Sequence, residues 1–237
     1  MNRFRSTITN LAATLVLASL FALALVATAA AQGGPAGGAS PMGGMMGPQP
    51  RGIFNPIVGS GAVYEIQRNG DDKKINLEIA VVGKESTDGK DSYWFETEAN
   101  TPMGQMIMKM LMVPDGANTN VTRMIMQMPG RPPMEMPQMG RLAQQRQSLD
   151  VRAEADKLGS ESVTTPAGTF TADHYRAKDG TGDFWLSDKI SPYGLIKYQG
   201  RGSTMVLTKV IADAKEKITG TPVPFNPMSM GGGQGPR

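Results

Sequence analysis

Apolar and polar residues alternate with a period of two through most of the middle of the chain. At Lys74–Val82, for example, apolar residues occupy every second position. Successive side chains of a β-strand point to opposite faces, so this pattern predicts strands with one apolar face. Turn signals such as Asn69-Gly70 and Thr165-Pro166-Ala167-Gly168 separate the runs. The predicted strands are Ala62–Arg68, Lys74–Val82, Ser92–Ala99, Met106–Val113, Asn120–Met128, Ser160–Thr165, Phe170–Lys178, Gly182–Ser187, Leu195–Gly200 and Ser203–Asp213.

One stretch departs from the alternation and predicts a helix. Pro129–Pro137 is rich in proline, which interrupts regular structure. Gln138–Leu158 then has no proline and many good helix formers. About ten strands and one helix, without regular alternation of the two, indicate a mainly β fold. We expect a curved antiparallel sheet or half-barrel.

The start of the chain has the pattern of a secretory signal peptide. Arg3 and Arg5 precede an apolar run, Leu11–Val26, and Ala29-Ala30-Ala31 offers small residues for cleavage. An uncleaved membrane anchor needs about 20 apolar residues, and this run is shorter. The chain has no cysteine to carry a lipid. We therefore expect a periplasmic or secreted protein that is not a lipoprotein and has no integral membrane span after cleavage.

The two ends of the mature chain share a composition rich in Gly, Pro and Met. Such segments bury too little apolar surface to offset the entropy lost on ordering, so both are predicted to be disordered. The predicted organisation is a signal peptide at 1–31, a disordered Gly/Pro-rich segment at 32–56, a single β-rich domain at 57–220 and a disordered tail at 221–237.

Charge and composition exclude several functions. The net charge of +3 falls to +1 without the signal peptide, because 22 basic residues then face 21 acidic ones. That balance gives no basis for nucleic-acid binding. The lack of cysteine excludes disulfides and thiolate sites. The single histidine, His174, excludes multi-histidine metal sites, and no nucleophile motif accompanies it. We expect neither enzymatic activity nor a cofactor; the oligomeric state stays open.

The unusual chemistry of this sequence is a set of methionines that alternate along two neighbouring predicted strands. On paired strands, their sulfurs share one face, because all occupy even positions. Pairing residues whose numbers sum to about 234 sets Met110 opposite Met124 and Met108 opposite Met126. The same register sets Met106 opposite Met128 and Met112 opposite Thr122. The seven methionines are Met106, Met108, Met110, Met112, Met124, Met126 and Met128.

The opposite face of this hairpin is mixed, so the methionine face is expected to point inward. Methionine is flexible and polarisable, which suits a surface that adapts to varied apolar partners. The leading hypothesis is therefore a non-enzymatic protein that binds an apolar or lipid-like ligand against these residues. The alternatives are copper(I) handling through thioethers, a sink for oxidants, and a structural or envelope-interaction protein whose methionines only pack the core.

The C-terminal half carries a recognisable pattern: Val163–Phe170 (VTTPAGTF), His174-Tyr175, Phe184–Ser187 (FWLS) and Ser191–Lys197 (SPYGLIK). It resembles a group of uncharacterised exported bacterial proteins, classed as domains of unknown function. These look like distant relatives of the periplasmic lipoprotein carriers and receptors of the Lol system. The resemblance covers roughly Val163–Val210. It implies a curved antiparallel sheet around a helix, with an apolar concavity in which some relatives hold acyl chains, and it transfers no site residues.

Overall fold

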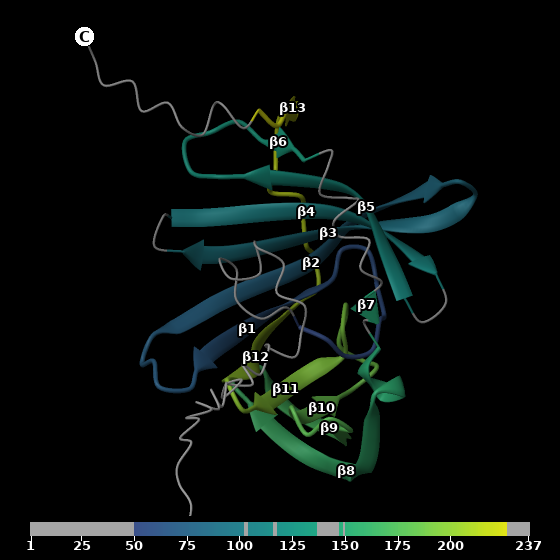
Figure 1. The fold of residues 1–237 in the computed structure, drawn as a ribbon, viewed down its shortest axis with the longest axis vertical. Coiled ribbons are helices and arrows are strands. Elements are labelled where there is room, and N and C mark those ends of the chain that lie inside the picture. The colour runs from purple at the N-terminus through teal and green to yellow at the C-terminus, as the bar shows by residue number, and fades with distance from the viewer. Residues whose placement is uncertain (1–49, 102–103, 116–117, 137–146, 149, 227–237) are drawn as a thin grey trace, which may run out of the picture. The chain divides into compact units, whose positions relative to one another are not determined.

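The computed structural model describes residues 50–101, 104–115, 118–136, 147–148 and 150–226 (Figure 1). The backbone divides into two units, residues 1–34 and 35–237, and the described residues all belong to the second. The predicted signal peptide therefore lies outside the described residues. The same holds for residues 32–49 and 227–237 of the two segments predicted to be disordered.

The described residues form a single 13-stranded sheet. Its strand order is β13-β6-β5-β4-β3-β2-β1-β12-β11-β10-β9-β8, with β7 paired to β5 off this path, so the sheet is open. Neighbouring strands are antiparallel except β13 and β6, which are parallel. The strands are β1 Gly61–Arg68, β2 Lys74–Thr87, β3 Lys90–Thr101, β4 Gly104–Asp115, β5 Asn118–Gln127, β6 Met134–Glu135, β7 Gln147–Ser148, β8 Ala155–Thr165, β9 Gly168–Ala177, β10 Gly182–Leu186, β11 Leu195–Gly200, β12 Ser203–Ile211 and β13 Val223–Pro224.

The predicted mainly β fold is confirmed, with three more strands than expected. The additional strands β6, β7 and β13 have two residues each. The predicted break between Val82 and Ser92 is absent, because β2 and β3 continue to a tight turn at Asp88-Gly89. Both turn residues have positive φ, 51° and 76°, which is the backbone of a type I′ hairpin. This Asp-Gly pair was an overlooked hairpin signal.

The predicted helix at Gln138–Leu158 is wrong wherever the structure describes it. The segment contains β7, a three-residue 3₁₀ turn at Val151–Ala153 and the start of β8. Residues 138–146 and 149 lie outside the described residues. Only Val151 of the turn is buried, and pairing of β8 with β9 satisfies the backbone that follows. Tertiary pairing thus overrides helix propensity. In the described ranges there is no α-helix, and no helix is long and apolar enough to cross a membrane.

Ordered contacts extend beyond the predicted 57–220 region at both ends. The Ile53 amide donates to the Tyr193 carbonyl at 2.6 Å. Phe54 stacks on Phe95 with ring centroids 5.7 Å apart. At the other end, β13 pairs with β6, and Phe225 packs against the main core. These segments were assigned to disorder because their composition is rich in Gly and Pro, yet Ile53, Phe54 and Phe225 pack against the core.

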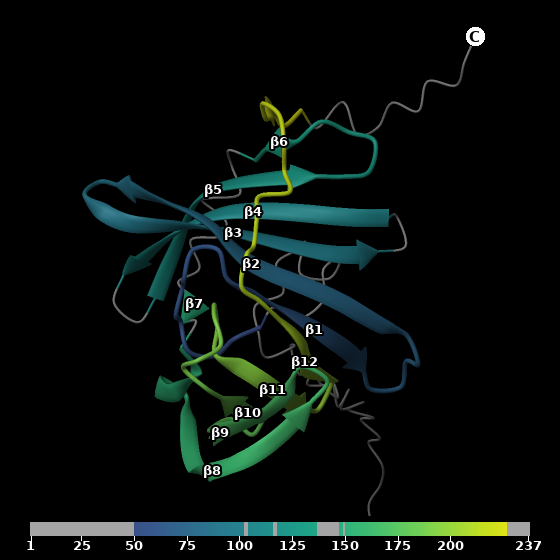
Figure 2. The ribbon, with the colours of Figure 1, turned by 180° about the vertical axis from the view of Figure 1, so that it is seen from behind.

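The two faces of β3–β5 carry different side chains. One face presents Phe95, Met110 and Met124, which are register partners in neighbouring strands. These belong to the main apolar core or pack against it. The opposite face has a second, smaller apolar cluster that includes Trp94 and Ile218. Ile218 belongs to residues 213–226, here called the C-terminal strap, which crosses this second face from β12 to β6 (Figure 2).

Candidate functional site

Two of the four predicted pairs of the methionine hairpin are confirmed. Met108 lies opposite Met126, and Met110 lies opposite Met124, as the sum of 234 requires. A bulge between Leu111 and Met112 shifts the register by one residue, so Met112 faces Val121 instead of Thr122. A bulge inserts an unpaired residue, which alternation alone does not foresee. Met128 directly follows β5, and the β4–β5 ladder begins at Ile107 and Gln127, so the predicted pair of Met106 and Met128 is not part of it.

The methionine face points inward, as expected. Five of the seven side chains are buried members of the main core, while the other two are half-buried. A further methionine, Met136, joins the same core although its position suggested no role. The buried five are Met106, Met108, Met112, Met124 and Met126.

Aromatic rings border the methionines. Tyr193, from the loop between β10 and β11, donates its hydroxyl to Met112 Sδ at 4.0 Å. Burial raises the pKa of Tyr193 well above its ordinary value, so the hydroxyl stays protonated at any physiological pH. Phe95 stacks between Phe54 and Tyr193, 5.8 Å from the latter. The methionine sulfurs thus lie in apolar and aromatic surroundings, where thioether–aromatic contacts are favourable.

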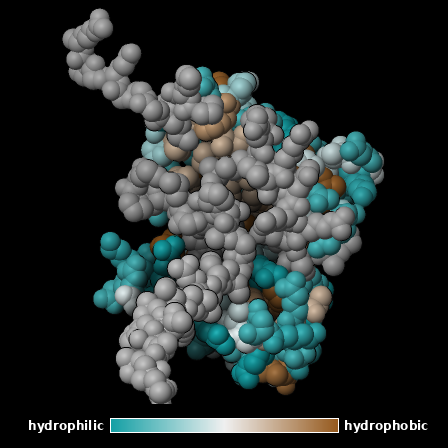
Figure 3. All heavy atoms as spheres, viewed as in Figure 1, coloured by the Kyte–Doolittle hydropathy of each residue, from teal (hydrophilic) through white to brown (hydrophobic). Residues whose placement is uncertain are grey.

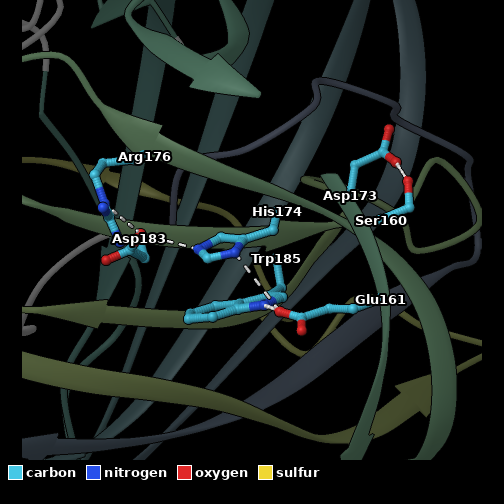
Figure 4. Close-up of polar contacts among 7 residues, drawn as sticks. All are labelled: Ser160, Glu161, Asp173, His174, Arg176, Asp183 and Trp185. Atoms are coloured by element: carbon cyan, nitrogen blue, oxygen red, sulfur yellow. Dashed lines mark hydrogen bonds and ion pairs between the residues drawn. The ribbon is translucent and has the colours of Figure 1, made fainter. Parts of the chain in front are cut away.

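A second group of interacting side chains surrounds His174 on β9 (Figure 4). Its imidazole stacks on Trp185 of β10, with centroids 4.4 Å apart and planes 14° from parallel. Lys197 of β11 lies over the same indole at 4.6 Å from the centroid. Both are register partners of Trp185, so the sheet itself aligns the three side chains. Contacts of this kind combine stacking and cation–π attraction.

Carboxylates flank the imidazole on both sides. His174 Nε2 lies 2.9 Å from Asp183 Oδ1, and Nδ1 lies 3.6 Å from Glu161 Oε1. Glu161 also accepts a short hydrogen bond from the Trp185 indole, and Asp183 accepts one from Arg176. The structure thus pairs the imidazole with a carboxylate on each side. No buried polar side-chain atom of this group lacks a hydrogen-bond partner, which is typical of a structural network.

A shallow pocket of about 150 Å³ lies next to His174. Leu158, Gly159, Ser160 and Glu161 of β8 complete its lining. Hydrophilic side chains gather over β8 and β9 in this region, at the bottom of Figure 3. The Ser160 hydroxyl bonds to Asp173 and not to His174, as Figure 4 shows, so the three do not form a catalytic triad.

Metal-ligating side chains do not cluster in the described part of the chain. No group of three or more His, Asp or Glu side chains there is placed to hold a metal ion. Glu96 and Glu98, which share a face of β3, bind the C-terminal strap instead of facing a cleft. The binding of these two glutamates to the strap was not foreseen, because the strap lies some 120 residues later in the chain.

Comparison with known proteins yields distant structural neighbours. No protein-family model matches the sequence, and no curated protein matches it. A candidate lipoprotein from Parabacteroides distasonis is 12% identical, with a TM-score of 0.34, over 69% of this chain and 100% of that one. A candidate exported protein with a YmcC-like fold from Bacteroides fragilis is also 12% identical, with a TM-score of 0.33, over 68% and 99%. Both scores are low, so the functional argument rests on the residues of this chain.

Proposed function

We propose that this protein is an exported, non-enzymatic binding module whose methionine face takes up an apolar, lipid-like ligand. The observation that carries the proposal is the confirmed register, which gathers the methionines of β4 and β5 on one inward face. A methionine side chain has three rotatable bonds, so such a face can rearrange around ligands of different shape at low energetic cost.

The distribution of methionine among the strands supports this proposal. A core that only had to be rigid is better filled by Leu, Ile and Val, whose rotamers are better defined. Here the methionines concentrate in two adjacent strands, while neighbouring β1 and β2 contribute Ile66, Leu77 and Ile79. Tyr193 contacts Met112, so a ligand on the methionine face would meet aromatic rings as well as thioethers. Ligand pockets typically combine such apolar linings with few polar groups.

The two alternatives make different demands. Copper(I) needs two or three sulfurs that converge at a point that solvent can reach, and the burial of five of the seven side chains does not favour that. Core packing alone needs no ligand at all, and the same burial is compatible with it. A ligand search therefore separates the leading proposal from the packing alternative.

The direct test is organic extraction of the full-length protein after purification under native conditions, followed by mass spectrometry. An acyl or other apolar species in stoichiometric amount supports the proposal. A protein that carries no such species, and that does not enhance the fluorescence of added acyl-chain probes, contradicts it. In that case the methionines serve the core alone.

Matched variants locate the site. Changing Met108, Met110, Met124 and Met126 to leucine keeps side-chain volume, and each such swap usually costs less than about 1.5 kcal/mol. The leucine face is stiffer, so the range of bound acyl chains should narrow while the fold persists. The control makes the same kind of swap on the opposite face, Ile107→Leu and Ile125→Leu, which should leave ligand binding unchanged.

A further inference from the structure

The C-terminal strap is held by a carboxylate that binds its backbone. Glu96 of β3, 4% exposed, accepts the Lys217 amide on Oε1 at 2.8 Å and the Ile218 amide on Oε2 at 3.2 Å. One buried side chain thus fixes two consecutive peptide groups of an extended segment. Recognition of this kind depends on the backbone, so it is available to any extended chain in the same position.

The neighbouring glutamates form a site for a cationic side chain. Glu78 of β2 and Glu98 of β3 lie directly opposite each other in the register. Like charges in this arrangement are destabilising unless a cation lies between them. Lys217 Nζ provides that cation, with Glu78 Oε1 at 2.7 Å and Glu98 on its other side. This part of the sheet is therefore suited to a lysine that approaches from outside.

An apolar surface follows the acidic pair. Ile218, 3% exposed, packs into the second apolar cluster with Trp94 and three aliphatic residues of β4 and β5. Lys109 and Arg123 lie over the Trp94 ring at 4.7 and 5.2 Å from its centroid, and Lys109 also pairs with Glu216. The three aliphatic residues are Ile107, Leu111 and Ile125.

Most residues of the C-terminal strap other than Ile218 are exposed to solvent. Its residues at 215–217, 219–221 and 223–224 face solvent, and Ile218 is its one fully buried residue among those described. At its end, β13 adds a two-residue parallel strand to β6. The strap thus resembles a bound peptide that is covalently tethered to its receptor, with a few anchors and a long solvent-exposed remainder (Figure 2).

We propose that the outer face of β2–β5 is a docking surface for an extended segment of a partner protein that carries a lysine followed by a branched aliphatic residue. The strap occupies this surface in cis and competes with the partner. The lysine enters between Glu78 and Glu98, Glu96 binds the backbone, and the aliphatic side chain contacts Trp94. This surface lies opposite the methionine face, so the proposal is independent of the proposed ligand.

The competition sets the partner's apparent affinity. A tethered segment behaves as if it were present at millimolar concentration, so a partner peptide of equal intrinsic affinity binds poorly while the strap is docked. Weakening the strap should therefore reveal the surface. The apparent affinity rises in proportion to the fraction of molecules whose strap is undocked.

The test uses the full chain with the double substitution Lys217→Ala and Ile218→Ala, and a fluorescent peptide with the sequence of residues 213–226. Fluorescence anisotropy should show binding at least about tenfold tighter than to the unmodified chain. The matched control is Lys215→Ala, which removes an exposed lysine whose ion pair, with Asp213, lies within the strap. That control should leave binding as weak as in the unmodified chain.

A second substitution identifies the surface. Adding Glu96→Gln to the double variant should weaken peptide binding, whereas Glu65→Gln, on β1 and paired with Lys74, should not. A peptide with glutamate in place of the lysine should not bind. If the double variant does not fold, Lys217→Ala alone provides the same test, with Trp185 emission as the check on folding.

Three results would overturn the proposal. The first is the absence of binding to the folded, strap-weakened chain. The second is binding that Glu96→Gln does not change, which places the peptide elsewhere. The third is dimerisation of the strap-weakened chain, seen by light scattering, with no uptake of peptide; the surface would then belong to a second copy of this chain.

Discussion

Two glutamates separated by one residue on β3 have pKa values shifted in opposite directions. Burial raises the pKa of Glu96, although the strap amides of Lys217 and Ile218 act against this. Burial alone would also raise the pKa of Glu98, but hydrogen bonds from Lys217 and Gln105 hold it below its ordinary value. The difference arises because Glu96 binds neutral amides in a dry position, whereas Glu98 binds a cation.

The lowered pKa of Glu98 predicts how its contribution to stability depends on pH. The ionised form stabilises the folded state above the ordinary glutamate pKa, and this contribution is lost as the pH falls through the lowered folded-state value. Glu98→Gln should therefore unfold at lower urea concentration than the native chain near pH 7. Urea titrations at decreasing pH should show the difference shrinking on acidification. A difference that stays constant with pH would contradict the ionic role.

Met126, 2% exposed, allows the two properties of methionine, volume and flexibility, to be separated. Met126→Ala removes buried volume and should lower the free energy of unfolding by about 2–5 kcal/mol. Met126→Leu keeps the volume and should cost less than about 1.5 kcal/mol. Urea unfolding of both variants checks this. Equal losses for the two substitutions would show that shape, and not volume, governs this position.

Among the elements, the hairpins were predictable and the segments at the two ends of the sheet were not. Alternation and turn residues are local signals, so the β4–β5 register and the methionine parity followed from sequence. The C-terminal strap lacks periodicity and contains Pro222 and Pro224, so no local pattern indicated it. Its position depends on Glu78, Glu96 and Glu98, which are distant in sequence. The methionine face of the candidate site was therefore predictable from sequence, whereas the aromatic residues that border it were not.

The segment before β1 depends on one close backbone approach. A Cβ placed on Gly52 would lie 2.0 Å from the Tyr193 carbonyl oxygen, and the adjacent Ile53 amide donates to that same carbonyl. Gly52→Ala should therefore displace this segment and destabilise the fold by about 1–3 kcal/mol. Limited proteolysis should then cleave near residue 52. The control is Gly202→Ala, where an added Cβ meets nothing within 4 Å; comparable cleavage in both variants would contradict the argument.

At the scale of the whole molecule, β1 and β12 join the two halves of the sheet. β1 pairs with β2 on one side and with β12 on the other. In the β1–β12 pairing, Gly61 lies opposite Ile211. Sequence patterns identified both strands but gave no indication that they pair, because strand order is set by packing between distant segments. The same limit explains why the edges of the sheet, at β13 and β8, were not foreseen.

This pairing predicts that the two halves unfold together. Trp94 on β3 reports on one half and Trp185 on β10 reports on the other, so the variants Trp185→Phe and Trp94→Phe each leave a single reporter. Both should show the same urea midpoint, as cooperative unfolding requires. Ile66→Ala, at a fully buried position of β1, should shift both midpoints equally. Separate midpoints would show that the halves fold independently.

The pairing of β1 with β12 also has a consequence for synthesis on the ribosome. A nascent chain exposes one edge of β1 from the synthesis of that strand until residues 203–211 have been made. An exposed strand edge is a template for pairing with other chains. The growing polypeptide thus needs protection from aggregation throughout that interval, because the two halves of the sheet are joined only once β12 has been made.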